Sequence, residues 1–212
     1  MGNTPEYAAI TDQPDDISDP ELEETFQKIA ESRGYVSNLM QTIAHAPEGL
    51  HPFAALGQYC RYGTELTERQ KEIAILVALR DVHYGLRHHV PLARAAGLTE
   101  EQVLLIQEGR VPRDLDPVDH VLCEFAFEIA ACRHVPPRIE QAIHAQFQPR
   151  QIVDIALLTS YYMATAAMII ALDVQLEAPE VLAHEQAWQD RFLPPPAPLP
   201  EPEDEDPKTP PR

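Results

Sequence analysis

The chain has 212 residues with a formal net charge of -18 at pH 7, and 44% of its residues are hydrophobic. A chain of this length can bury the core of one sizeable domain. The acidity is concentrated at the two ends, since residues 1–24 carry a charge of -8 and residues 193–212 carry -3. Such a charge argues against a nucleic-acid partner, because no basic surface replaces the counterions of a phosphate backbone.

The cysteine content and the apolar segments indicate a cytoplasmic protein. Three cysteines occur, none of them in a C-x-x-C pair, and the absence of a signal-peptide pattern favours a reducing compartment. Residues 155–172 are uncharged and long enough to suggest a membrane span. They include threonine, serine and tyrosine and lack a flanking basic cluster, so we expect a buried central helix and no membrane partner.

In chain order, the pattern predicts an all-α domain between two extensions. Residues 1–18 lack a hydrophobic period and are predicted to be a mobile acidic arm. Residues 193–212 contain nine prolines and are predicted to be a disordered tail. Between them, over 19–192, apolar residues recur at helical spacing and no segment alternates as strands do. The eight to ten predicted helices cover 19–33, 36–46, 50–63, 67–79, 83–97, 99–108, 116–133, 136–147, 149–172 and 181–192.

The segment 83–98 begins with three histidines, a tyrosine and an arginine within seven residues. His89 falls on an apolar helical face, at i+3 from Leu86 and i−4 from Ala93. Burial disfavours the charged form of an imidazole, and a neutral imidazole suits a general base. The alternative is a core histidine that bonds to a backbone carbonyl.

Four further residues in or near this segment are candidates for the same pocket. Tyr84 and His88 lie four apart and share a helical face. Arg87 is either a ligand for a substrate carboxylate or a surface arginine, and His83 is a second candidate for substrate binding. Pro91 cannot bond the carbonyl four residues earlier, so we expect the helix to restart near His88 or to kink there.

Two candidates lie upstream. Glu72 follows Lys71 in a strongly apolar helix, and is either a semi-buried carboxylate with a raised pKa or a solvated side chain. His45 ends the helix over 36–46 and either contributes to a pocket or only caps that helix.

A metal site is an alternative use of the histidines. Zinc and iron accept imidazole ligands readily, and His83, His88 and His89 would be the ligands, with His45 as a possible fourth. Adjacent residues of a helix point about 100° apart, however, and these three lack the i, i+4 pairing typical of helical metal sites. We therefore expect no cofactor.

Several stretches together resemble one known family. They are LTERQKEIAIL over 66–76, YGLRHHVPLARAAGL over 84–98, NLM over 38–40 and AHAP over 44–47, with Tyr161-Tyr162 inside 158–172. This combination resembles the carboxymuconolactone decarboxylase family, which includes the alkylhydroperoxidase D-like proteins, over residues 34–177. The resemblance implies an all-α multi-helix bundle that assembles into a homo-oligomer, commonly a trimer or hexamer.

The resemblance also implies which chemistry is available. The peroxidase branch of the family uses a C-x-x-C pair with a Glu and a His, and the chain has no such pair. The decarboxylase branch reads Tyr-Glu-Trp-x-x-His, so His89 matches the family histidine, whereas Gly85 and Leu86 replace its acid and tryptophan. The connection from Glu72 is about two residues shorter than usual, and Glu72 is a possible match to the family's other acid.

Three hypotheses follow. The first is a cofactor-free enzyme for proton transfer, by decarboxylation or isomerisation, on a small organic acid, lactone or polyketide-like substrate. In it, His89 is the base, Arg87 anchors a carboxylate, and Tyr84 or His88 stabilises an enolate. The second is a metal-dependent enzyme on the same scaffold. The third is a binding or scaffold protein whose site has decayed.

Overall fold

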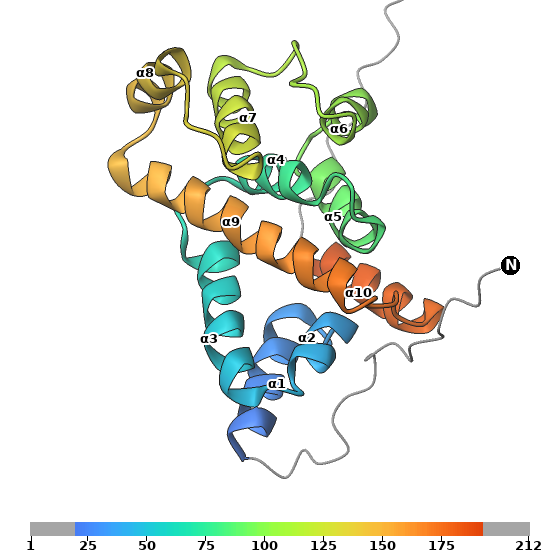
Figure 1. Ribbon diagram of the computed structural model, residues 1–212. Coiled ribbons are helices and arrows are strands. Elements are labelled where there is room, and N and C mark those ends of the chain that lie inside the picture. Colours follow the sequence, from blue (N-terminus) through green and yellow to red (C-terminus); the bar gives the residue numbers. More distant parts are fainter. Residues whose placement is uncertain (1–19, 193–212) are drawn as a thin grey trace, which may run out of the picture.

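A computed structural model describes residues 20–192 of the chain, and within them it contains ten α-helices, one π-helical turn and no strand (Figure 1). The all-α prediction is confirmed, whereas the predicted arm over 1–18 and tail over 193–212 lie outside the described residues. The elements are α1 Pro20–Arg33, α2 Asn38–Ile43, α3 Pro47–Gln58, the π turn η1 Tyr59–Gly63, α4 Glu68–Leu79, α5 His83–Ala95, α6 Glu100–Gln107, α7 Pro117–Ala130, α8 Pro137–Gln146, α9 Pro149–Ala171 and α10 Pro179–Phe192.

The helix starts follow local chemistry that is visible in the sequence. Thr67 and Thr99 accept hydrogen bonds from the backbone N–H three residues later, and Gln70 and Gln102 reach back to complete both capping boxes. Asp116 caps α7 in front of a proline. The predicted spans differ from the observed helices mainly at their ends. The span over 36–46 shortens to α2, that over 83–97 ends as α5 at Ala95, and that over 116–133 ends as α7 at Ala130. The span over 50–63 begins earlier, at Pro47, and divides into α3 and η1.

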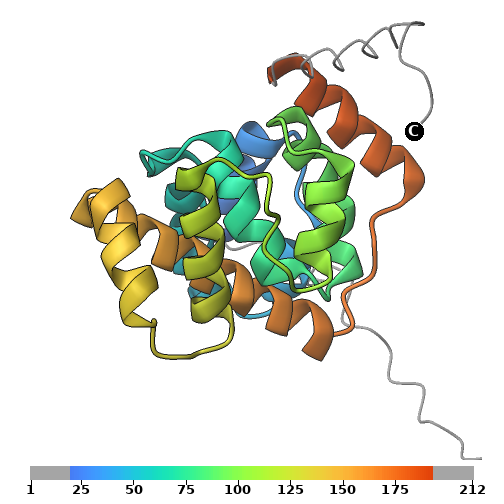
Figure 2. The ribbon, with the colours of Figure 1, turned by 90° about the horizontal axis from the view of Figure 1, so that it is seen from above.

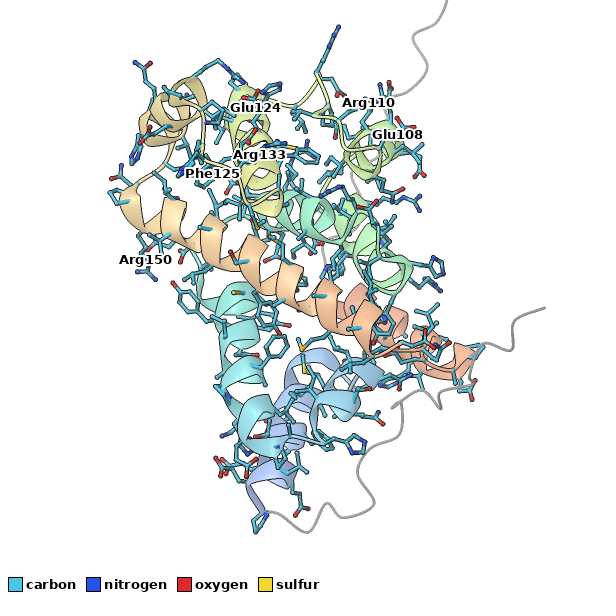
Figure 3. All side chains as sticks on the ribbon, in the orientation of Figure 1. Glu108, Arg110, Glu124, Phe125, Arg133 and Arg150 are labelled. Carbon is cyan, nitrogen blue, oxygen red and sulfur yellow. The ribbon has the colours of Figure 1, made fainter. Side chains whose placement is uncertain are left out.

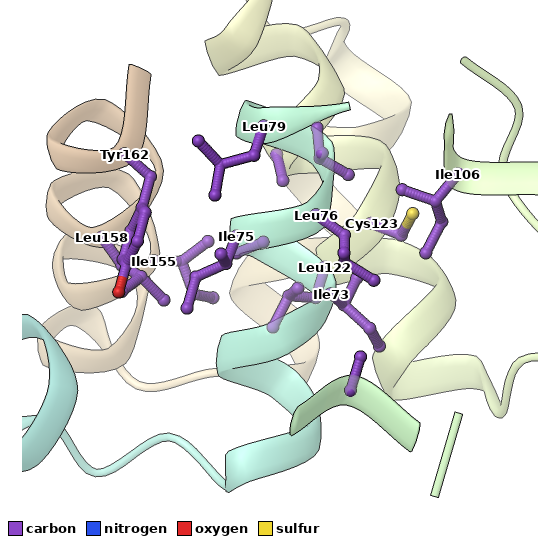
Figure 4. Close-up of a cluster of buried hydrophobic side chains, with 14 of the residues drawn as sticks. Ile73, Ile75, Leu76, Leu79, Ile106, Leu122, Cys123, Ile155, Leu158 and Tyr162 are labelled. Carbon is purple, nitrogen blue, oxygen red and sulfur yellow. The ribbon is translucent and has the colours of Figure 1, made fainter. Parts of the chain in front are cut away.

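The core forms where α9 crosses α4 (Figure 1), and α7 packs against both helices. α4 is apolar around most of its circumference, and eight of its twelve residues are buried. A helix that is apolar all round has to be covered on every side. Figure 4 shows Ile75 and Leu79 of α4 between Leu158 and Tyr162 of α9 on one side and α7 on the other.

A second, smaller cluster holds α1, α2 and α3 together. Its buried members are Leu22, Ile29, Met40, Ala44 and Leu50. Seen from above, these three helices lie beneath the α4–α9 core, and α10 runs along the side of the molecule next to α5 (Figure 2). The N-terminal layer therefore closes the core from below.

α9 is long and apolar enough to cross a membrane, but half of its most apolar stretch is buried inside the protein. It is the central helix that the sequence predicts.

α5 runs through Pro91 without interruption, so the expected restart near His88 does not occur. Arg150, labelled in Figure 3, lies in the first turn of α9, where its guanidinium Nη1 is 3.2 Å from Glu65 Oε1.

Two glycines of α3 test how tightly the helices meet. A Cβ on Gly57 would lie 2.3 Å from the Tyr161 hydroxyl and 2.7 Å from Cζ of the same rigid ring, whereas a Cβ on Gly49 would meet only Ala46 Cβ at 3.9 Å. We expect Gly57→Ala to lower the free energy of unfolding by about 1–3 kcal/mol. Gly49→Ala should leave it unchanged or raise it by up to ~1 kcal/mol. Urea denaturation of both variants checks this, and equal effects would contradict the close approach.

Candidate active site

The side chain of Glu72 is the centre of the site. It projects from α4 with 1% of its surface exposed. One carboxylate oxygen, Oε1, accepts a hydrogen bond from Arg61 Nη1 at 2.7 Å, and the other, Oε2, lies 2.9 Å from Nδ1 of His89 on α5. A buried carboxylate is stable only when it is paired and hydrogen-bonded, and both of its oxygens are used here.

The pKa values of this pair move in directions that suit a base. Burial pulls the pKa of Glu72 upward, but His89 and Arg61 outweigh it and hold the pKa below its ordinary value. Glu72 is therefore ionised. Of the two alternatives that the sequence left open for it, a semi-buried carboxylate with a raised pKa or a solvated side chain, the burial is observed without the raised pKa, because His89 and Arg61 share the site. Burial lowers the pKa of His89, and although Glu72 opposes this, Arg61 and His88 add to the lowering. His89 is neutral at pH 7.

A neutral imidazole beside an ionised carboxylate has one favourable tautomer. Nδ1 carries the hydrogen and donates it to Glu72, so the lone pair lies on Nε2. Within the described residues Nε2 has no hydrogen-bond partner, and 13% of the His89 side chain is exposed. This arrangement is that of a carboxylate-oriented general base.

Aromatic side chains of α9 and α3 form one wall beside His89. The ring of Tyr162 meets the imidazole edge-on, with centroids 5.0 Å apart, and Tyr161 stands edge-on to Tyr162 at 5.3 Å. Phe53 of α3 packs against Tyr161 at 4.6 Å. Both tyrosines are 4% exposed, so this wall is rigid.

Arg61 is a site residue that sequence reasoning missed. It lies in η1, a π-helical turn between two core segments, and is 9% exposed. Its second guanidinium nitrogen, Nη2, donates a hydrogen bond to Glu68 at 3.2 Å. Lys71 Nζ donates to the backbone carbonyl of Arg61 and to the Glu68 carboxylate. The only sequence signal was a charged residue inside an apolar segment, and π turns of this kind occur often at functional sites.

His88 and Tyr84 point away from Glu72 into a separate polar cluster. His88 Nε2 lies 3.0 Å from Glu177 Oε2, and His88 Nδ1 lies 2.8 Å from Glu185 Oε2. Tyr84 donates to Glu177 Oε1 at 2.5 Å, and its ring packs on His88 with centroids 4.7 Å apart. Tyr84 and His88 share a helical face, as predicted. This face contacts the segment after α9, and the two side chains do not lie beside His89.

Three predicted site residues are exposed. His83 and Arg87 follow one another at i, i+4 on the outer face of α5, and His45 lies in the turn between α2 and α3. Arg87 and His89 are two positions apart on the helix, which places their side chains about 200° apart around its axis. The structure does not bring Arg87 or His83 beside His89, so any role for them in binding stays a prediction.

The three histidines of α5 do not converge. Among the described residues no group of three His, Cys, Asp or Glu side chains has the arrangement of a metal site. His83 is exposed, His88 holds two carboxylates on opposite ring nitrogens, and His89 bonds Glu72. The geometry of these residues therefore does not support the metal-site hypothesis.

The structure explains why Gly85 replaces an acid. A Cβ at this position would lie 2.7 Å and 2.9 Å from the two methyl carbons of Leu79, which is 1% exposed. α4 and α5 approach so closely here that any side chain would force the buried Leu79 to shift. Thiol chemistry is equally unfavourable, because Cys60 is buried and its surroundings raise its pKa to about 11.

The comparisons with known proteins give the fold and no closer relative. No family model and no curated sequence matches the chain. A peroxidase-related protein from Silicibacter sp. TM1040 superimposes with a TM-score of 0.66 at 23% identity, over 84% of this chain and 96% of its own. The alkylhydroperoxidase AhpD core of a peroxidase-related protein from Ralstonia eutropha JMP134 gives a TM-score of 0.62 at 19% identity, over 85% and 95%. This chain has the AhpD-like fold.

A third neighbour on the AhpD-like fold was solved with a ligand. The debrominase Bmp8, as a variant in complex with 2,3,4-tribromopyrrole, superimposes with a TM-score of 0.65 at 19% identity, over 88% of this chain and 98% of its own. These identities are low, so the likeness shows the fold alone. The resemblance inferred from 66–76 and 84–98 is confirmed at the level of the fold.

The charge states of the site give a test that needs no substrate. We expect the ring signals of His89 in NMR to titrate below 6.5, the ordinary pKa of histidine. Replacing Arg61 by Gln removes a positive charge that disfavours the imidazolium, so the pKa of His89 should rise, whereas Arg61→Lys should keep it near the wild-type value.

Arg87→Gln is the matched control, because it removes a charge from the outer face of α5, and the pKa of His89 should stay where it is. A wild-type His89 that titrates above 6.5, or one that ignores Arg61→Gln, would contradict the proposed neutral base.

Proposed function

We propose that the protein is a cytoplasmic, cofactor-free enzyme of the carboxymuconolactone decarboxylase-like type, in which His89 transfers protons on a small organic acid, lactone or polyketide-like substrate. One observation carries this proposal. His89 is held by a buried, ionised Glu72 through Nδ1, and its Nε2 has no partner within the described residues. A neutral, oriented imidazole with one unused nitrogen is the arrangement that general base catalysis requires.

The chemistry follows from that geometry. Nε2 takes a proton from a carbon next to a carbonyl group, and the electron pair of the broken C–H bond passes into an enolate. Glu72 lies 2.9 Å from Nδ1 and stabilises the resulting imidazolium. The hydrogen bond from the Arg61 guanidinium keeps the Glu72 carboxylate ionised. In an isomerisation His89 returns the proton to another carbon. In a decarboxylation Nε2 first takes the proton of the substrate's carboxyl group, the electron pair of the broken C–C bond passes into the enolate as CO2 departs, and the imidazolium then returns the proton to the carbon.

The wall formed by Tyr162, Tyr161 and Phe53 supports a small substrate with a flat face. Rigid aromatic rings offer contact area to planar groups without losing conformational entropy. Bmp8, which shares the fold, was solved in complex with 2,3,4-tribromopyrrole, a small planar ring. The positive charge of Arg61 beside the site already pairs with Glu72 and Glu68, and that of His88 with Glu177 and Glu185, so the proposed site favours substrates whose reacting part is uncharged.

Substitution of His89 tests the base directly. His89→Ala should lower kcat on a panel of lactone acids and small β-keto acids by about 10²–10⁴-fold, because general base catalysis contributes this much. Glu72→Gln should also lower kcat, since an amide can donate to Nδ1 and so move the hydrogen to Nε2. The pH–rate profile should fall on the acid side only below pH 6.5, because the base works when it is unprotonated.

His83→Gln is the matched control, a histidine on the exposed face of the same helix, and it should retain wild-type turnover. Turnover that survives His89→Ala would remove His89 from the mechanism.

We also propose that the protein self-associates through α9. The residues Val153, Leu157, Ser160, Ala164, Ala167 and Ala171 are exposed and recur at alternating spacings of four and three. This is the spacing of a helix–helix seam, and the small side chains allow a close approach. The stripe is also uncharged on a chain whose net charge is -18, so two copies can meet there without repulsion.

We expect Leu157→Glu to shift the protein from an oligomer to a monomer in light scattering coupled to size-exclusion chromatography. Leu104→Glu is the control, because Leu104 is 47% exposed on α6, away from the stripe. A wild-type protein that is monomeric at tens of micromolar would contradict the proposal.

A further inference from the structure

The cluster around His88 is the largest group of buried titratable side chains that the proposed reaction does not use. It lies where four parts of the chain meet, and each part contributes a titratable side chain. His88 and Tyr84 come from α5, Tyr35 from the turn before α2, Glu177 from the segment after α9, and Glu185 from α10. His88 is 9% exposed, and the side chains of Glu177 and Glu185 are 2% and 14% exposed.

The geometry favours a positive charge on His88. Each of its ring nitrogens faces a carboxylate oxygen, Glu185 at 2.8 Å and Glu177 at 3.0 Å. Ionised carboxylates only accept hydrogen bonds, so both contacts are hydrogen bonds only in the imidazolium form. The Tyr35 hydroxyl, 3.3 Å from Nδ1, then donates to Glu185. The two carboxylates outweigh the effect of burial and raise the pKa of His88 to about 9. Burial and the same carboxylates raise the pKa values of Tyr35 and Tyr84, so both hydroxyls remain donors.

The two carboxylates are secured to different degrees. Glu177 also accepts a hydrogen bond from the backbone N–H of Asn38 at 2.9 Å and one from Tyr84, so it keeps two donors without His88. Glu185 belongs to α10 and also interacts with the Tyr35 hydroxyl. When His88 loses its proton, it can donate a hydrogen bond to only one of the two carboxylates. Loss of the bond to Glu185 weakens the contact between α5 and α10.

The described side chains of α10 add little apolar burial. Among residues 179–185 and 187 none is buried, and Val181 and Leu182 are the most apolar partly covered positions. α10 contacts α1, and the pair of His88 with Glu185 is its charged link to α5.

We propose that His88 is a proton-operated clamp that fastens α10 onto α5, closed while the imidazole is charged and open once it is neutral. The direction follows from linkage. Glu185 contributes part of the rise of the His88 pKa above the ordinary 6.5, and this part stabilises the docked state at low pH and is lost as the pH rises through about 9. Because Glu177 stays beside His88 when α10 leaves, the ratio of docked to undocked α10 should fall by roughly one order of magnitude over that range.

The two adjacent histidines of α5 thus have different charges at neutral pH, since one is neutral and the other is positive. His89 is neutral because it is buried and a guanidinium lies near it, and His88 is charged because two carboxylates enclose it. The clamp does not depend on the proposed reaction, so it can be tested on the protein without a substrate.

Hydrogen–deuterium exchange at pH 7 tests the ion pair. Glu185→Gln and His88→Gln should each raise the exchange of peptides from 179–192 several-fold, while peptides from α4 stay protected and show that the bundle is folded. His83→Gln, on the exposed face of the same helix, should exchange as the wild type does. If His88→Gln does not fold, Glu185→Gln alone decides, and unchanged exchange of α10 in that variant would overturn the clamp.

The pH dependence can be followed on the backbone of α10 itself. After correction for the intrinsic exchange rate at each pH, the protection of peptides from 179–192 should fall with a midpoint near pH 9 in the wild type. In Glu185→Gln the protection should already be low at pH 7 and change little up to pH 10. Protection that changes with pH equally in both proteins would show that His88 is not the titrating group and would overturn the proposal.

Discussion

Glu72 carries a full negative charge inside the most buried helix of the protein, and the candidate site depends on how that charge is balanced. Arg61 reaches it from a π turn that precedes α4, and His89 reaches it from α5. Removing one partner of such a buried group typically costs about 3–5 kcal/mol, because it leaves an uncompensated charge. The carboxylate therefore ties η1, α4 and α5 together at one point, and it sets the tautomer of the histidine through the same bond.

The arrangement around α5 shows how one helix can carry two imidazoles with different tasks. His88 and His89 are neighbours in sequence but point about 100° apart, so each meets a different set of charges. His89 turns inward to Glu72 and the tyrosines of α9, whereas His88 turns toward the segment that follows α9. Their opposite protonation states follow from their partners, since the two residues themselves are identical.

Much of the fold is readable from the sequence because its signals are local. The capping boxes at Thr67 and Thr99, the prolines that open α7, α8 and α9, and the helical spacing of apolar residues predict the helices nearly one by one. His89 on an apolar face and Glu72 within an apolar helix were predictable in the same way. The pairing of these two residues was not, because it depends on how α4 and α5 pack.

The rest of the site is a property of the tertiary structure. Arg61 has no motif around it, and only the π turn directs its guanidinium to Glu72, which is why the pKa of that carboxylate is lowered where the sequence suggested it would be raised. Glu177 and Glu185 lie far along the chain from His88 and meet it only because α10 folds back along α5. By itself, the sequence determined the helices and the residue types available for proton transfer, since both depend on near neighbours. Which histidine is neutral and which is charged was decided by tertiary packing, because a pKa responds to charges and burial that distant segments supply.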